Sequence, residues 1–308
     1  MPRLACIHDA GAHVLTPEAR RAVEQAATEP QVFEEGFDIE ASRRAARELA
    51  AAQPREDVDE VVDLDADGVR CRLYRPAGAR PGAVVHLHGG GFVFHDIDVH
   101  DAAARRLANR ARRAVVSVDY RRPPEHPFPA APDDVDTVLR WIDREGAAHG
   151  LDGPLYAHGD SAGGNLALVA ALRHPGRFHA VALIYPFLDP TSGFDSYRTE
   201  QHAFDLREAE WYWQQYAADP ADREHPDLAP LRSDRLWTLP PTLVVTAEHD
   251  PLRDEGERLA EMLAEHGVTV VATRYLGQIH GFWRHHDVFP AAQPLMLQVV
   301  GFFEAQSA

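Results

Sequence analysis

A serine between two glycines is the residue of this chain best placed to do chemistry. Residues 159–163 read Gly-Asp-Ser-Ala-Gly, with Ser161 at the centre, and separate an apolar run at 155–158 from a helix-compatible run at 165–172. A sharp turn between a strand and a helix exposes such a hydroxyl at the edge of a sheet, where it can attack a carbonyl carbon. The alternative is a glycine-rich phosphate or packing turn, but a phosphate loop requires a lysine and this sequence contains none. We therefore predict that Ser161 is a catalytic nucleophile.

A serine hydroxyl needs a neighbouring base, and the base needs a carboxylate to orient it. Chain order in this type of site is serine, then acid, then histidine, so both partners should lie downstream of Ser161. Asp250 follows a predicted strand at 243–246, and His280 lies beside a glycine on a loop after the last predicted strand. A helix N-cap is the structural alternative for Asp250. The competing acids and bases are Glu248, Asp254, His266, His285 and His286.

A run of three glycines follows another predicted strand, at 84–87, and is preceded by His88. Acyl transfer builds negative charge on a carbonyl oxygen, and fixed backbone N–H groups stabilise that charge. Such a loop, together with the amide after the nucleophile, is expected to form an oxyanion hole. The predicted donors are Gly89, Gly90 and Ala162.

These residues need a sheet to bring them together, and the chain pattern predicts one. From residue 81 onward, short apolar runs alternate with helical stretches such as 132–145, which is typical of an α/β protein with a mostly parallel sheet and helices on both faces. Ligands bind at the carboxyl ends of the strands in such sheets. Two earlier segments surround a turn and predict a β-hairpin. The eight predicted strands are 59–64, 69–74, 84–87, 114–118, 155–158, 181–185, 243–246 and 268–274.

Two segments fall outside this alternation. Residues 1–52 read as helices rich in Ala, Glu and Arg. Residues 189–236 separate two strands by more than an ordinary connection and contain an aromatic cluster at 211–216. We predict that this insertion packs with the N-terminal helices. The aromatic cluster either lines an acyl or alcohol pocket or, the interpretation we favour, packs a helix of the insertion on the core.

Charge and cysteine content exclude several classes of protein. The 308 residues carry 31 basic side chains, all of them arginine, and 48 acidic ones, for a net charge of −17. Binding to nucleic acid or to an anionic membrane surface needs an excess of basic charge, so we predict neither partner. Cys6 and Cys71 make no disulfide framework, and the N-terminus has no apolar core of signal-peptide length, so we predict a cytoplasmic protein. No apolar run is long enough to span a membrane.

The motifs together resemble those of the hormone-sensitive-lipase-like family of bacterial carboxylesterases, which have the α/β-hydrolase fold. The matching stretches are 88–92, 119–121, 124–131, 159–165, 250–255 and 280–282. The resemblance assigns the same nucleophile, acid, base and oxyanion donors as the residue patterns above. It also implies a two-part helical cap, made of residues 1–52 and 189–236, over a catalytic core made of residues 53–188 and 237–308.

The resemblance further implies a small-molecule ester substrate, a preference for short acyl chains, no cofactor, no metal and a homodimer. Two departures from the family pattern flank the loops on the oxyanion side and bear on substrate fit. Arg122-Pro123 replaces the usual Leu-Ala, and His95 stands where the family commonly has glycine.

The predicted function is therefore that of a serine hydrolase that cleaves carboxylic esters through an acyl-enzyme. An amidase, deacetylase or lactonase with the same triad is the alternative among enzymes, and a non-catalytic small-ligand receptor of the same fold is the alternative from another class. The pair His86-x-His88 places two imidazoles on one strand face. No cysteine or carboxylate motif accompanies the pair, so a structural role is predicted for it rather than a metal site.

Overall fold

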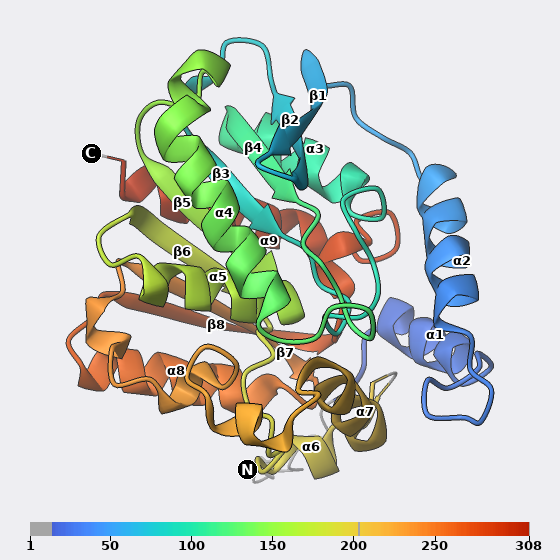
Figure 1. Cartoon of the computed structure of the whole chain (residues 1–308). Helices are drawn as coiled ribbons and strands as arrows, with labels where there is room; N and C mark the ends of the chain where they lie inside the picture. Colours follow the sequence, from blue (N-terminus) through green and yellow to red (C-terminus); the bar gives the residue numbers. More distant parts are fainter. Residues whose placement is uncertain (1–13, 203, 308) are drawn as a thin grey trace, which may run out of the picture.

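A sheet of eight strands forms the centre of the computed structural model, which describes residues 14–202 and 204–307 (Figure 1). Most neighbouring strands are parallel, and antiparallel pairing is confined to β1 with β2 and β2 with β4. The predicted hairpin and mostly parallel sheet are confirmed. Across the sheet, the strands are β1 (Glu60–Ala66), β2 (Val69–Arg75), β4 (Arg113–Val118), β3 (Arg80–Leu87), β5 (Leu155–Asp160), β6 (Phe178–Ile184), β7 (Thr242–His249) and β8 (Val270–Ile279).

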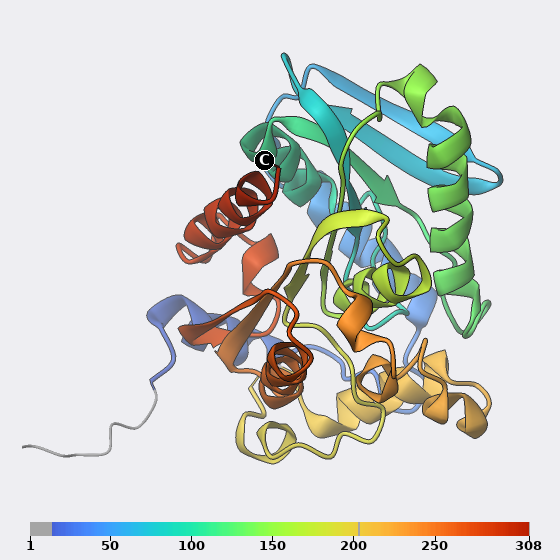
Figure 2. The ribbon, with the colours of Figure 1, turned by 90° about the vertical axis from the view of Figure 1, so that its left-hand side faces the viewer.

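Helices cover both faces of this sheet (Figures 1 and 2). One face shares a hydrophobic core with α4 (Ala130–Glu145), α5 (Ala162–Arg173) and α8 (Arg253–Glu265). The other face packs against α3 (Asp101–Ala111) and α9 (Ala292–Ala305). The whole of β5 is buried in the middle of the sheet, so the turn from β5 into α5 is held from both sides.

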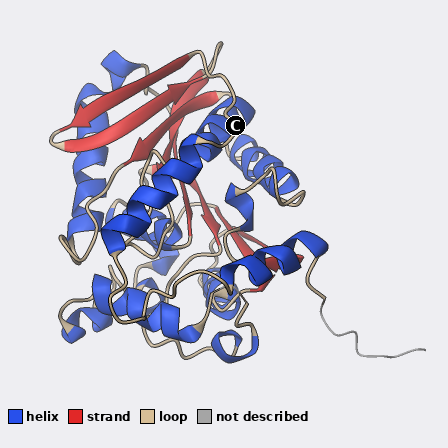
Figure 3. Cartoon of the chain, turned by 90° about the vertical axis from the view of Figure 1, so that its right-hand side faces the viewer, coloured by secondary structure: helices blue, strands red, loops and turns tan. Residues whose placement is uncertain are grey.

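Two further groups of helices come from distant parts of the chain (Figure 3). The first is α1 (Pro17–Ala26) and α2 (Ile39–Ala51), and α1 begins as its sequence indicates, with the Thr16 side chain accepting a hydrogen bond from the N–H of Ala19. The second, from the insertion, consists of α6 (Ser196–Thr199), α7 (Leu206–Tyr216) and the short 3₁₀ turns η2 (Pro220–Glu224), η3 (Pro230–Arg232) and η4 (Leu236–Thr238).

The two groups contact one another through aromatic side chains. The ring of Phe37, which precedes α2, lies 6.4 Å from that of Trp211 on α7. The guanidinium of Arg207 lies 3.7 Å from the ring centre of Phe33. The predicted packing of the insertion with the N-terminal helices is therefore present among the described residues, whereas residues 1–13, including Cys6, lie outside them.

The last strand is longer than predicted. Its pairing with β7 is interrupted between Ala247 and His249 and then resumes, with His249 opposite Ile279. Because β8 continues to Ile279, His280 directly follows a strand. Within the described ranges, no helix combines the length and apolar character needed to cross a bilayer.

Candidate active site

Ser161 lies in the turn between β5 and α5, in a backbone conformation that few residues other than glycine adopt. Its φ is 55° and its ψ is −123°, and its N–H donates to the carbonyl of Ile184 on β6 at 2.9 Å. A Cβ at Gly159 would overlap the carbonyl group of Gly163, and a Cβ at Gly163 would overlap that of Leu87. The two glycines therefore let β5, α5 and β3 approach closely, and the tight turn holds the serine at the end of the strand.

The structure brings the predicted serine, acid and histidine together. The hydroxyl of Ser161 donates to Nε2 of His280 at 2.9 Å, and Nδ1 of His280 donates to Oδ2 of Asp250 at 2.8 Å. A carboxylate only accepts, so the imidazole proton lies on Nδ1 and the lone pair of Nε2 faces the hydroxyl. The other carboxylate oxygen of Asp250 accepts the N–H of Leu252 at 2.9 Å. Asp250 therefore makes both the contact with the base and the local backbone contact that its sequence position allows.

The surroundings of His280 favour its protonated form. Burial lowers the pKa of His280, but the charge of Asp250 and its hydrogen bond raise it more, so the pKa lies above its usual value. The rings of Tyr185 and Phe204 lie 4.5 Å and 5.1 Å from the imidazole and limit its movement. This imidazole is thus oriented to accept a proton from the serine hydroxyl.

The competing acids and bases make other contacts. Glu248 accepts the N–H of Gly277 at 2.7 Å, and Asp254 accepts the N–H of Ser196 at 2.9 Å. The competing histidines lie at the end of α8 or between β8 and α9, as His266, His285 and His286.

The glycine loop after β3 disagrees with one predicted oxyanion donor. The N–H of Gly89 donates to Oδ1 of Asp160 at 3.1 Å, so this donor is already engaged inside the protein. Gly90 and Gly91 follow with φ values of 119° and 58°, which glycine adopts without strain. Among the described residues, no acceptor contacts the N–H groups of Gly90, Gly91 or Ala162. Ala162 is the first residue of α5, where the helix leaves backbone N–H groups without partners.

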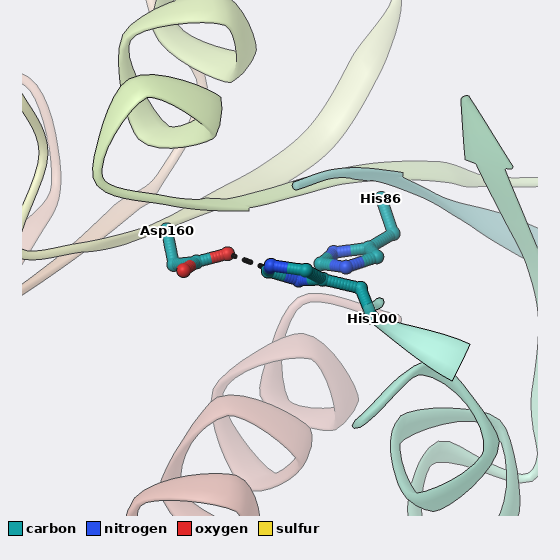
Figure 4. Close-up of side chains that lie close together, drawn as sticks. All are labelled: His86, His100 and Asp160. Carbon is teal, nitrogen blue, oxygen red and sulfur yellow. Dashed lines mark ion pairs between the residues drawn. The ribbon is translucent and has the colours of Figure 1, made fainter. Parts of the chain in front are cut away.

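Asp160 is a residue of the site that sequence reasoning missed, although it lies inside the serine motif. Its carboxylate is buried and faces His100, with 3.6 Å between Nδ1 and Oδ1, and His86 lies beside them (Figure 4). Burial raises the pKa of Asp160 to about 6, although the nearby Arg284 guanidinium lowers it. Asp160 therefore connects the oxyanion loop, through Gly89, to a group of buried histidines.

Two groups of side chains bring three metal-ligating atoms within 4.8 Å of one another, namely His86, His100 and Asp160, and Glu200, His202 and His249. In the first group, the buried Arg284 guanidinium acts electrostatically on Asp160 and His100, which opposes the binding of a second cation. In the second group, Glu200 already pairs with His249 at 3.0 Å and with Arg253 at 3.0 Å.

The spaced pair His86 and His88 makes separate contacts. Nδ1 of His86 lies 3.0 Å from Nδ1 of His158 on β5, whereas Nδ1 of His88 lies 2.9 Å from the carbonyl oxygen of Gly89. Burial lowers the pKa of His86 to about 4 and that of His88 to about 3, so both imidazoles are neutral at pH 7. These contacts agree with the structural role predicted for the pair.

The aromatic cluster on α7 divides between the core and the site. The rings of Trp213 and Tyr216 are fully buried and lie 4.2 Å and 3.8 Å from the rings of core phenylalanines. Tyr212 instead lies against the oxyanion loop, where a Cβ at Gly91 would overlap its ring. The packing interpretation thus describes Trp213 and Tyr216, whereas Tyr212 borders the site.

The two departures from the family pattern contact each other. Nη1 of Arg122 donates to the carbonyl oxygen of His95. His95 has a φ of 62°, a conformation that glycine adopts more readily, which agrees with a glycine being common at this position. The carboxylates of Asp96 and Asp119 lie 3.7 Å and 3.8 Å from the same guanidinium. Arg122 therefore ties the end of the oxyanion loop to the loop after β4.

Comparison with known proteins agrees with this geometry. A family model described as the alpha/beta hydrolase fold matches residues 84–284. Esterase LipI of Mycobacterium tuberculosis is 36% identical over 271 residues, which cover 82% of this chain and 84% of LipI. An ethyl acetate hydrolase of Pseudomonas putida is 33% identical over 283 residues, covering 86% of this chain and 89% of its own. The structure of a hyperthermophilic esterase from the archaeon Pyrobaculum calidifontis superposes with a TM-score of 0.84 and 35% identity, covering 96% of this chain and 100% of its own.

Proposed function

Because the chain belongs to the hormone-sensitive-lipase-like family of carboxylesterases, which have the α/β-hydrolase fold and hydrolyse carboxylic esters, we propose that it acts through an acyl-enzyme on Ser161. The observation that carries this proposal is the continuous hydrogen-bonded chain from Ser161 through His280 to Asp250. These three side chains come from three separate post-strand loops and meet with the geometry of a nucleophile, a base and an orienting acid.

In the acylation step, Oγ of Ser161 attacks the ester carbonyl carbon while Nε2 of His280 accepts the hydroxyl proton. Asp250 stabilises the resulting imidazolium, which then gives its proton to the leaving alcohol as the ester C–O bond breaks. Water next attacks the acyl carbon and transfers a proton to His280. The bond from the acyl carbon to the serine oxygen then breaks, and that oxygen recovers its proton from the imidazolium.

The negative charge that develops on the carbonyl oxygen needs donors, and we assign that role to the N–H groups of Gly90, Gly91 and Ala162. All three N–H groups lack an acceptor among the described residues, whereas that of Gly89 is bonded to Asp160. The predicted pair of loop donors thus moves one residue along the chain. Each such donor typically stabilises the transition state by about 3 kcal/mol.

A preference for short acyl chains is part of the proposal. Tyr212 lies directly against Gly91, and Phe204 lies against His280, so aromatic rings border the site from the insertion. The related Pseudomonas protein is named for a short ester, ethyl acetate. A series of p-nitrophenyl esters from C4 to C16 tests this preference, and faster turnover of the C16 ester would contradict it.

The decisive test of the esterase assignment is Ser161→Ala. The variant should lose turnover of p-nitrophenyl butyrate while keeping its circular dichroism spectrum, because it lacks only the attacking oxygen. Wild-type-like rates in the variant would end the assignment. Covalent labelling of the wild type, but not the variant, by an organophosphonate separates an enzyme from a non-catalytic receptor. Comparing matched esters, amides and lactones separates an esterase from an amidase, a deacetylase or a lactonase.

A cytoplasmic location and a homodimer complete the proposal. The location rests on cysteine usage, with Cys71 buried as a free thiol. Cell fractionation tests the location, and size-exclusion chromatography with light scattering tests the dimer.

A further inference from the structure

Glu208 is a carboxylate of the insertion that the reaction above does not use. It lies one helical turn before Tyr212 on α7, and residues four apart on a helix share a face. Tyr212 in turn lies against Gly91 of the oxyanion loop. The hydroxyl of Tyr212 donates to Oε1 of Glu208 at 2.9 Å. Glu208 thus stands one contact away from the place where the ester carbonyl must bind.

The contacts of Glu208 leave one of its oxygens available. Within the described part of the chain, the bond from Tyr212 is the hydrogen bond printed for its carboxylate, and Oε2 has no donor. The side chain is partly exposed, whereas Ala209 and Trp213 on the core-facing side of α7 are buried. Burial nevertheless raises the pKa of Glu208 to about 7, which places the carboxylate in a confined space rather than in open solvent.

The charges around Glu208 connect it to the catalytic base. The titratable groups that face it are Tyr212 on α7, Asp205 at the N-cap of α7 and His280 on the loop after β8. Glu208 and His280 act on each other, because the carboxylate raises the pKa of the imidazole and the imidazole lowers the pKa of the carboxylate. Phe204 lies between them, 5.1 Å from the ring of His280 and 6.3 Å from that of Tyr212.

The alcohol half of the ester is the part that meets this carboxylate. His280 gives its proton to the leaving oxygen, so the alcohol must depart beside the imidazole. A carboxylate without a cationic partner, beside a site in a protein with a net charge of −17, attracts positive charge and repels anions.

We propose that Glu208 is a specificity residue that recognises a positively charged group, such as an ammonium, in the alcohol half of the ester. The enzyme would then favour cationic esters over neutral esters of the same shape. This inference rests on the proposed ester hydrolysis and names the class of substrate for that same site.

The test compares butyrylcholine with 3,3-dimethylbutyl butyrate, which differ in a quaternary nitrogen against a quaternary carbon. The quantity measured is the ratio of the two kcat/KM values. Both substrates use the same triad, so the titration of His280 cancels in the ratio. As the carboxylate of Glu208 ionises, the ratio should rise about tenfold between pH 6.0 and pH 8.5, as expected of a partly solvated charge pair.

Variants identify the residue responsible. Glu208→Gln should abolish the rise and lower the ratio at pH 8.5 about tenfold. Glu210→Gln removes the same charge from an exposed position of the same helix and should preserve the rise. Glu208→Asp, which keeps the charge, should preserve part of it.

The outcomes separate this inference from the proposed function. If the wild type hydrolyses the neutral ester but shows the same ratio at both pH values, Glu208 is not a specificity residue and the esterase assignment stands. The wild-type pH series decides this without depending on the folding of any variant. If the wild type hydrolyses neither these esters nor p-nitrophenyl butyrate, the proposed function itself is wrong.

Discussion

Acid should unfold this protein because it buries neutral histidines that an unfolded chain would protonate. Four of them have 0% exposure and lie near the end of β3, on β5 or before α3, as His86, His88, His100 and His158. Burial lowers the pKa of every one of them. A base whose pKa is lower in the folded state contributes stability above its unfolded pKa and loses it as the pH falls.

The magnitude follows from the shift of His86, from 6.5 to about 4. Between pH 8 and pH 5, that shift removes about 2 kcal/mol of unfolding free energy. Four such histidines together remove about 8 kcal/mol, which is comparable with the whole stability of a typical domain. Asp160 acts in the opposite direction, because its raised pKa of about 6 favours the folded state on acidification by about 1 kcal/mol.

Urea unfolding followed by tryptophan fluorescence at pH 8 and pH 5 measures this loss directly. The wild type should lose several kcal/mol at the lower pH. His158→Asn should reduce the difference by about 2 kcal/mol because it removes one titrating group. His179→Asn alters an exposed histidine on the neighbouring strand β6 and should leave the difference unchanged. Unfolding free energies that agree within about 1 kcal/mol at the two pH values would refute this reasoning.

Three further substitutions test the site and its supports. Asp250→Asn should lower kcat about 10⁴-fold with little change in the circular dichroism spectrum, because it destabilises the productive tautomer of the base; retention of full activity would remove Asp250 from the triad. Gly91→Ala should reduce kcat at least 100-fold in an ester assay, since its Cβ would overlap Tyr212 near an oxyanion donor, whereas Gly176→Ala has a similar positive φ but open space and should leave kcat unchanged. Arg43→Met should lower the free energy of unfolding by about 3 kcal/mol in urea, because the buried guanidinium donates to two backbone carbonyls and a carboxylate, whereas the exposed Arg44→Met should change it by less than about 0.5 kcal/mol.

The triad positions were predictable because they depend on features that sequence carries directly. Ser161 sits in a glycine turn between a buried strand and a helix, and Asp250 and His280 each follow an apolar run. In a parallel sheet the strand ends meet at one edge, so residues far apart in the chain are brought together by topology alone. The strand boundary before His280 was less accurate, because β8 continues past an irregularity in its pairing that no local pattern marks.

The oxyanion donors and the aromatic border depend on finer geometry. A run of three glycines shows that backbone N–H groups are available, but the hydrogen bond from Gly89 to Asp160 determines which of them remain free. On α7, helical spacing places Glu208 and Tyr212 on one face. Only the docking of that helix against Gly91 reveals that this face borders the site. Tertiary contacts between an insertion and a core have no signature in local sequence.

The twisted backbone of the nucleophile has a consequence for evolution and for engineering. With φ at 55° and ψ at −123°, Ser161 occupies a conformation that costs a side-chain-bearing residue on the order of 1–3 kcal/mol. Glycine at the same position would relax that strain and yield a hardier but inert protein. Chemistry and endurance are thus opposed at a single residue, and a search that rewarded thermal robustness alone would tend to discard the one oxygen atom on which turnover depends.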